Sequence, residues 1–246
     1  MSENRNFKLI YLLPNIFTAA SIFIGVLSII EASKGNFVIA SWYILASLIF
    51  DGLDGRVARL TNSTSKFGVE FDSLADVIAF GIAPSMLLYF FIGSQYGKFG
   101  IFISAMFVIF GAIRLARFNV TTFLNEPNVF IGLPIPAAAV FITMWVLTFQ
   151  EYQELNSLAV ILLPLSVLVS ILMVSNIRYP SFKKVQFQKS ATLKLLIIII
   201  LICFTLYVFP IEGITILFSI YVLFGLVRAI YNLSKIFYLN SLDKKN

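Results

Sequence analysis

The sequence predicts an all-α protein, a polytopic bundle of transmembrane helices with about eight spans. Hydrophobic residues make up 59% of its 246 residues, and the mean hydropathy is +0.94. Apolar stretches long enough to cross a bilayer, which takes roughly 20 residues each, follow one another almost from end to end. Short polar connections separate these stretches. We therefore expect a single membrane-embedded domain over residues 1–246.

The bounds of each expected span follow from hydropathy and from turn residues. No small-residue cleavage site follows the first apolar stretch, so it is expected to remain as a span rather than be removed as a signal peptide. Asn15, near its start, is expected mainly to cap this helix. Pro134 and Pro136 mark the entrance of the fifth span. The expected spans are 14–33, 37–60, 68–92, 99–118, 130–149, 157–176, 192–209 and 212–233.

Charged residues set the expected orientation, because Lys and Arg accumulate on the cytoplasmic side of membrane proteins. With the N-terminus inside, every Lys and Arg except Lys34 and Lys98 falls on that side. An even number of spans then puts both termini in the cytoplasm. The net charge of +6 is spread over several connections, so no nucleic-acid partner is expected. A bacterial plasma (inner) membrane is the expected location, with membrane lipids as neighbours.

Composition also limits the cofactors. Cys203 is the single cysteine and the chain has no histidine, so an internal disulfide and the usual zinc or haem ligands are excluded. Oxygen ligands must therefore hold any metal.

Four aspartates stand in the second and third expected spans, where a carboxylate costs roughly 2.5–3.5 kcal/mol at the helix centre. Asp51 and Asp54 are three residues apart, and Asp72 and Asp76 are four apart. Each pair therefore projects from one face of its helix. If the two faces meet, four anionic groups need a cation, and carboxylate oxygens suit magnesium, manganese or calcium. We expect a site for two divalent ions.

Small and basic residues extend this acidic face. Gly55 and Ala58 leave space beside the carboxylates, and Arg59 offers a planar fork suited to phosphate oxygens. Carboxylate-held metal together with a guanidinium describes a site for a diphosphate.

The string Asp51–Arg59, followed by Gly68, Asp72 and Asp76, resembles the motif of the CDP-alcohol phosphatidyltransferases, D-x2-D-G-x2-A-R-x8-G-x3-D-x3-D. All eight specified positions are matched. The motif occupies residues 51–76, and further helices are expected over 99–239. The resemblance implies a membrane enzyme that transfers a phosphatidyl group from CDP-diacylglycerol, and it implies a homodimer.

The resemblance also implies roles for individual residues. Asp51 and Asp72 would bridge two metal ions, Asp54 would complete one, and Asp76 would complete the other and accept the proton of the attacking hydroxyl. The residues that would contact the CDP-lipid are Gly55, Ala58, Arg59, Ser65 and Gly68. Asn15 could also reach the nucleotide, as the alternative to its role as a helix cap.

The acceptor alcohol is suggested by three later segments, 114–119, 132–139 and 173–183, which resemble the branch of the family that uses L-serine. The products would be phosphatidylserine and CMP. Arg114 or Arg117 would bind the serine carboxylate, although both also suit positive-inside anchors. Asn119 would bind the ammonium group, cap a helix or stabilise the loop.

Two alternatives remain open at this point. A sister transferase with glycerol phosphate or inositol phosphate as acceptor would share the metal site and need more basic residues around it. A cation transporter would also carry intramembrane carboxylates, but it should place polar groups at successive depths of the bilayer. The four aspartates instead lie beside Arg56, Arg59 and Lys66, near the predicted cytoplasmic face.

Overall fold

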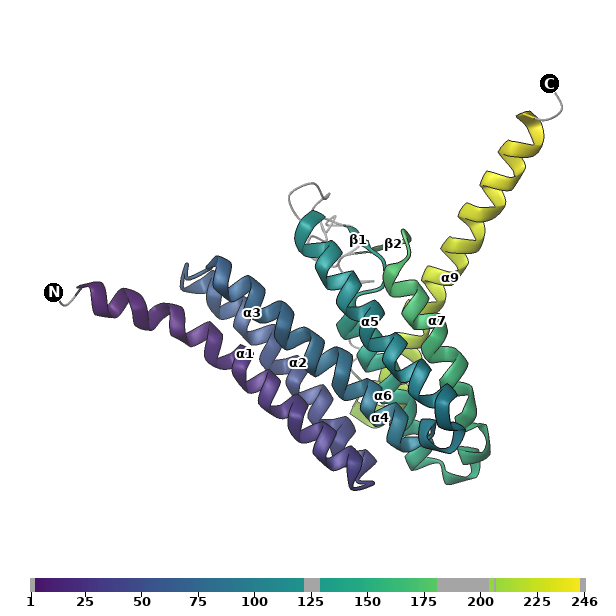
Figure 1. Cartoon of the computed structure of the whole chain (residues 1–246), viewed down its shortest axis with the longest axis horizontal. Coiled ribbons are helices and arrows are strands. Elements are labelled where there is room, and N and C mark those ends of the chain that lie inside the picture. The colour runs from purple at the N-terminus through teal and green to yellow at the C-terminus, as the bar shows by residue number, and fades with distance from the viewer. Residues whose placement is uncertain (1–2, 122–128, 181–203, 206, 244–246) are drawn as a thin grey trace.

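The computed structural model describes residues 3–121, 129–180, 204–205 and 207–243. Helices dominate this part of the chain, as the sequence predicts (Figure 1). The α-helices are α1 Glu3–Ser33, α2 Phe37–Leu60, α3 Lys66–Asp76, α4 Ala83–Phe91, α5 Gly97–Thr121, α6 Ile135–Glu151, α7 Leu162–Val174 and α9 Pro210–Asp243. A π-helical segment, Val77–Ile82, joins α3 to α4, and 3₁₀ segments occupy Gly93–Tyr96 and Gln153–Ile161.

Six helical stretches of the described chain are long and apolar enough to cross a membrane. They are Leu12–Ser33, Phe37–Leu60, Lys66–Phe91, Gly93–Thr121, Gln153–Val174 and Pro210–Tyr231, and a shorter apolar helix covers Ile135–Glu151. These seven correspond to seven of the eight expected spans. The remaining one, 192–209, lies mostly outside the described residues, so the count of eight stays a prediction.

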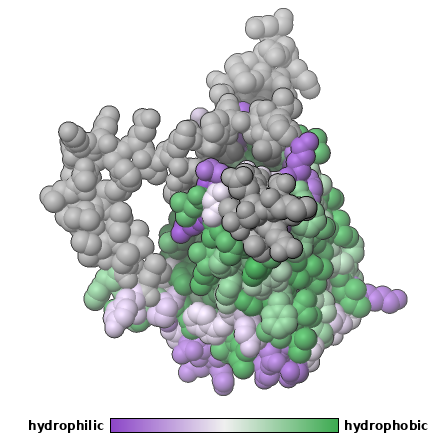
Figure 2. Space-filling model, turned by 90° about the vertical axis from the view of Figure 1, so that its left-hand side faces the viewer, coloured by the Kyte–Doolittle hydropathy of each residue, from purple (hydrophilic) through white to green (hydrophobic). Residues whose placement is uncertain are grey.

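The surface agrees with a membrane environment. Figure 2 shows a broad hydrophobic face with hydrophilic residues gathered along its lower edge and near its upper end. In Figure 1 the two termini and the start of α3 lie toward the same end of the bundle, opposite the turn between α1 and α2. This arrangement is consistent with termini on one side of the membrane. Which side that is stays a prediction.

Buried serines hold neighbouring helices together. Ser28 Oγ donates a 2.8 Å hydrogen bond to the carbonyl oxygen of Ala40, and Ser21 Oγ donates one of 3.2 Å to the carbonyl oxygen of Ser47. Small residues allow the close helix contacts typical of membrane bundles. At Gly25, for example, an added Cβ would lie 3.0 Å from the Cα of Ala79. The tight packing of α1 against α2 and the following span fixes the helices that carry the aspartates.

A short antiparallel β-pair joins distant parts of the chain, a feature that the sequence did not predict. Strand β1 Val129–Ile131 pairs with β2 Arg178–Pro180. Gly132 follows β1 with φ +78°, a left-handed conformation that favours glycine, and Pro134 keeps an extended conformation before α6 begins. The expected start of this span at residue 130 was therefore wrong, because the strand and the turn at Gly132 come before the helix, which begins at Ile135.

Candidate active site

The two acidic faces meet, as the helical spacing predicted. Asp51 comes from α2, whereas Asp72 and Asp76 come from α3, and each offers a carboxylate oxygen within 4.8 Å of the others. Asp51 also interacts directly with Asp76. Three carboxylates this close repel one another unless protons or cations neutralise them.

Asp54 forms the second half of the cluster. Its side chain is buried, interacts directly with Asp72, and accepts a 2.7 Å hydrogen bond from Thr18 Oγ1. Thr18 belongs to α1, so the first helix takes part in the site. The four aspartates thus run from Asp54 and Asp72 on one side to Asp51 and Asp76 on the other.

The donor set fits a hard divalent metal ion. It consists of carboxylate oxygens alone, which suit magnesium, manganese or calcium. Oδ1 of Asp76 is buried and has no hydrogen-bond partner among the described residues. A buried carboxylate oxygen without a donor is costly, and a bound cation would satisfy it. The described residues can therefore hold metal at this cluster.

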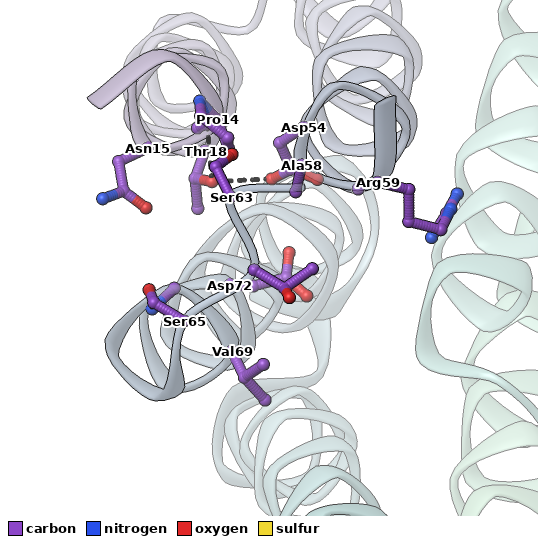
Figure 3. A pocket seen from close by; sticks show the side chains of 13 residues that line it. Pro14, Asn15, Thr18, Asp54, Ala58, Arg59, Ser63, Ser65, Val69 and Asp72 are labelled. Carbon is purple, nitrogen blue, oxygen red and sulfur yellow. Dashed lines mark hydrogen bonds between the residues drawn. The ribbon is translucent and has the colours of Figure 1, made fainter. Parts of the chain in front are cut away.

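A pocket of about 220 Å³ opens beside Asp54 and Asp72, between α1, α2 and the start of α3 (Figure 3). It contains all five residues expected to contact the CDP-lipid. Its lining is Pro14, Asn15, Thr18, Asp54, Gly55, Ala58, Arg59, Ser63, Thr64, Ser65, Gly68, Val69 and Asp72. A space this size next to the carboxylates can accept a diphosphate and part of the group attached to it.

The start of α3 shapes one wall of this pocket. Ser65 is the N-cap of α3, and its Oγ accepts a 3.0 Å hydrogen bond from the backbone N–H of Gly68. A Cβ added at Gly68 would lie 3.2 Å from that Oγ and 3.6 Å from Oδ1 of Asn15. Glycine therefore lets α3 approach α1 closely at this point.

Asn15 was wrongly expected to cap the first helix. The helix begins at Glu3 and continues through Pro14, so Asn15 lies inside it and faces the pocket (Figure 3). Proline within the helix removes one backbone donor without ending the helix. The amide of Asn15 is consequently available to a ligand rather than to the helix start.

Arg59 lies along α2 beside Gly55. A Cβ added at Gly55 would stand 3.5 Å from Nη1 of Arg59, and the guanidinium interacts electrostatically with Asp54. The missing side chain at position 55 leaves this arginine room next to the carboxylates. Gly55 and Arg59, which are both expected to contact the CDP-lipid, therefore lie side by side in the pocket lining.

Sequence reasoning missed part of the pocket wall, notably Thr18, Ser63 and Val69. For Thr18 a signal was present, because a hydroxyl three residues after Asn15 lies on the same face of an apolar helix. Ser63 and Val69 carry no comparable signal. The positions of Ser63 and Val69 in the pocket wall depend on the conformation of the turn between α2 and α3.

Arg114 of α5 lies near Asp76 and does not line the pocket. Its side chain is only 6% exposed, interacts electrostatically with Asp76, and places its guanidinium carbon 5.3 Å from the ring centroid of Phe118. Its Nε has no hydrogen-bond partner among the described residues. A buried arginine with a spare donor is suited to an anionic ligand.

Arg117 has a different environment. Its guanidinium donates hydrogen bonds to the Asn176 side chain and to backbone carbonyls at the end of β1 and around the end of α7. These carbonyls belong to Ile131, Met173, Val174 and Ser175, at 2.9–3.3 Å. Arg117 therefore binds the end of α7 to the β-pair, and these bonds occupy donors that an acceptor would need.

Asn119 connects α5 to α3. Its Nδ2 donates a 3.0 Å hydrogen bond to Ser73 Oγ and a longer one, 3.5 Å, to Glu70. Ser73 is the neighbour of Asp72, so this contact supports the helix that carries the aspartates. Of the three candidate acceptor residues, Arg114 alone combines burial with a donor that lacks a partner among the described residues.

Comparisons with known proteins agree with this geometry. The sequence model of the CDP-alcohol phosphatidyltransferase family matches residues 11–172. A CDP-diacylglycerol–serine O-phosphatidyltransferase of Helicobacter pylori is 52% identical over 230 residues, which cover 93% of this chain and 95% of that protein. A protein of the same name from Bacillus subtilis is 34% identical, covering 70% of this chain and 92% of the relative.

An archaeal relative, the archaetidylserine synthase of Methanothermobacter thermautotrophicus, is 38% identical over 170 residues, covering 68% of this chain and 69% of that protein. The family match spans more than half of the chain and includes the four aspartates and the whole pocket lining. The family match favours a phosphatidyltransferase over the cation transporter, which the aspartates alone had left open as an alternative. This membrane protein belongs to the CDP-alcohol phosphatidyltransferase family.

Proposed function

We propose that the protein makes phosphatidylserine and CMP from CDP-diacylglycerol and L-serine. The observation that carries the proposal is that the carboxylate cluster borders the pocket at two of its aspartates and lies near a buried arginine at another. The pocket of α1, α2 and α3 borders Asp54 and Asp72, whereas Arg114 stands beside Asp76. We propose that the donor substrate approaches Asp54 and Asp72 and that the acceptor substrate approaches Asp76.

The pocket is proposed to bind the CDP-lipid. Arg59 and the N–H groups at the start of α3 offer positive charge to the diphosphate. Gly55, Ala58 and Gly68 allow the ligand close to the backbone, and Ser65 fixes the α3 start by its cap. The amide of Asn15, which faces the same space, is proposed to contact the nucleotide.

The carboxylates are proposed to hold two divalent ions, Mg²⁺ or Mn²⁺, with Ca²⁺ as a further candidate. Asp51 and Asp72 would contact both ions, Asp54 the first and Asp76 the second. Bound metal would neutralise the cluster and stabilise negative charge on the departing CMP. Asp76 accepts the proton of the serine hydroxyl while that oxygen attacks the phosphorus bearing diacylglycerol and the bond to CMP breaks.

Serine is favoured over a phosphorylated acceptor by the cations near Asp76. Arg114 offers one buried guanidinium, which matches one carboxylate. The neighbouring Arg117 already donates to carbonyl oxygens. A phosphate group would need more positive charge than this side of the cluster supplies within the described residues. The name of the Helicobacter relative points to the same acceptor.

The deciding experiment compares acceptors. Purified protein in detergent is supplied with CDP-diacylglycerol and magnesium or manganese, and CMP release is measured with L-serine, glycerol 3-phosphate or inositol phosphate. We expect release with L-serine and none above background with the others. Release without serine, or only with a phosphorylated alcohol, contradicts the proposal.

We also propose a homodimer in the plasma membrane with the active site near the cytoplasmic face. Light scattering in detergent measures the oligomer. For orientation, Cys203→Ser gives a cysteine-free background, and single cysteines at Asn36 and Asn62 mark the two ends of α2. A membrane-impermeant maleimide applied to intact cells should label the first position and spare the second. The reverse pattern would invert the topology.

A further inference from the structure

One isoleucine side chain packs against two glycines on different helical elements. Ile135 is the first residue of α6 and is fully buried. A Cβ added at Gly111 of α5 would lie 2.6 Å from Cδ1 of Ile135, and a Cβ added at Gly81 of the π-helical segment would lie 3.7 Å from the same atom. The terminal methyl group of Ile135 therefore contacts both α5 and the span Lys66–Phe91, which carries Asp76.

The two glycines lie about one helical turn from the residues that we assign to the acceptor reaction. Gly111 precedes Arg114 by three residues in α5, and both lie on the buried face of this helix. Gly81 follows Asp76 by five residues, which is about one turn of the π-helical segment. A displacement of α5 at Gly111 would consequently move Arg114 relative to Asp76.

The backbone just before Ile135 is held by hydrogen bonds to two other helices. The N–H of Leu133 donates a 3.0 Å hydrogen bond to the carbonyl oxygen of Leu172, near the end of α7. From α5, Arg117 Nη2 donates one of 3.2 Å to the carbonyl oxygen of Ile131. The start of α6 is therefore anchored to α7 and to α5, so the backbone at Ile135 is fixed in place.

The side chain of Ile135 has little freedom as well. It belongs to the buried core, and Sδ of Met173 lies 4.0 Å from the same added Cβ at Gly111. Protein interiors are packed so densely that a change of one methyl group is felt by its neighbours. A Cβ at Gly111 would force Ile135 or α5 to move, whereas removal of Cδ1 would let α5 move toward α6.

We propose that Ile135 is a positioning residue whose Cδ1 sets the place of α5 against the span Lys66–Phe91, and thereby the place of Arg114 relative to Asp76 for the acceptor amino acid. The inference rests on the proposed function, since it assumes that the acceptor binds at Arg114. It assigns a role in acceptor binding to a residue of the apolar core. Ile135 itself is not proposed to touch the reacting atoms.

The test exchanges one methyl group between two positions. Gly111→Ala adds a Cβ beside Cδ1 of Ile135, and Ile135→Val removes Cδ1 and keeps both Cγ atoms. At roughly a hundredfold per ångström of misplacement, a shift of a few tenths of an ångström corresponds to about a fourfold effect. We therefore expect each single variant to raise the KM for L-serine about fourfold or more. The kcat at saturating serine and the KM for CDP-diacylglycerol should stay within about twofold.

The double variant Gly111→Ala/Ile135→Val is the decisive measurement. With valine at position 135, the nearest side-chain atom to the new Cβ is Cγ1 at 3.4 Å, an ordinary van der Waals contact. One methyl group is removed and one is added, and such volume-conserving exchanges are tolerated best. The KM for serine should therefore return to within about twofold of the wild type, whereas independent effects would multiply to about sixteenfold.

Ile142→Val is the matched control, because it removes the same methyl group from another buried position of α6. It should leave the KM for serine unchanged. A thermal melt of each preparation shows that the protein is folded. If Gly111→Ala alone does not fold, the comparison of Ile135→Val with the double variant decides the question.

Three results would overturn the inference. They are a wild-type KM for serine in Ile135→Val, a KM in the double variant that is not restored, and an equal rise of this KM in Ile142→Val. Wild-type protein that releases CMP without regard to serine contradicts the proposed function instead, so the two failures are distinguishable.

Discussion

Thr18 Oγ1 donates a 2.7 Å hydrogen bond to Oδ2 of Asp54, and this contact joins the first helix to the acidic motif. Both side chains are buried. The same Oγ1 of Thr18 lies 3.2 Å from the carbonyl oxygen of Pro14, one turn earlier in α1. The orientation of a motif aspartate is therefore set partly by a residue more than thirty positions away in the sequence.

Thr18→Val should lower kcat/KM for CDP-diacylglycerol about tenfold or more, because it removes a hydrogen bond to a charged group and keeps the shape. Steady-state kinetics with varied CDP-lipid measures the loss. Thr18→Ser retains the hydroxyl and should stay within about threefold of the wild type. Wild-type kinetics in the valine variant would show that Asp54 does not depend on this contact.

Asp76→Asn should reduce turnover by about a hundredfold or more, the range expected when a general base is lost. The fold should survive, since the amide has almost the shape of the carboxyl group. CMP release and a thermal melt of the same preparation measure both quantities. Glu154→Gln, at an exposed position near the start of the 3₁₀ segment Gln153–Ile161, is the control for charge removal and should behave as the wild type. Near-normal turnover in the asparagine variant would exclude Asp76 as the base.

Chelation of divalent metal should abolish activity and lower the melting temperature, because three carboxylates within 4.8 Å lose their counter-charge. Adding back magnesium or manganese should restore both. In Asp51→Asn the melting temperature should respond less to added metal than in the wild type. A melting temperature that is indifferent to metal in both proteins would contradict binding at this cluster.

Arg117 and Arg114 should respond differently to replacement by lysine. Arg117→Lys loses several hydrogen bonds to carbonyl oxygens at once and should cost about 2 kcal/mol of unfolding free energy, seen as a lower melting temperature. Arg114→Lys should mainly raise the KM for serine, because lysine lacks the planar fork. If Arg117→Lys instead raised the KM for serine and Arg114→Lys lowered the melting temperature, the acceptor would be assigned to Arg117.

Tyr152 gives a pH-dependent prediction. Its hydrogen bond to Glu212 raises the pKa of the phenol above its ordinary value near 10. The contact therefore stabilises the fold below about pH 10 and is lost as the pH rises through the higher folded-state value. Tyr152→Phe should melt earlier than the wild type at pH 7, and the difference should disappear at strongly alkaline pH. If the difference in melting temperature between Tyr152→Phe and the wild type stayed the same at every pH, the loss of stability would come from packing and not from the hydrogen bond.

The motif was predictable because it depends on local geometry. Three- and four-residue spacings place Asp51 with Asp54 and Asp72 with Asp76 on single faces, whatever the rest of the chain does. The contribution of Thr18 was harder to predict, because it needs the packing of α1 against α2. The β-pair, to which Arg117 donates a hydrogen bond, joins segments about fifty residues apart, and no local sequence pattern predicts it.

The π-helical segment Val77–Ile82 begins at the residue after Asp76. Its end is marked by the N–H of Ala83, which bonds to the carbonyl oxygen of Ile78, five residues back instead of four. Such a segment accommodates one residue more than a regular helix of equal rise. Deleting a single residue here should convert the segment to α-helix and leave the direction of the acidic face relative to α4 almost unchanged, whereas a deletion in the regular helix of α4 should turn the part of the helix beyond it by about 100°. The span that carries Asp72 and Asp76 thus tolerates a change of length at one place only, in an apolar stretch that has no acidic residue of its own.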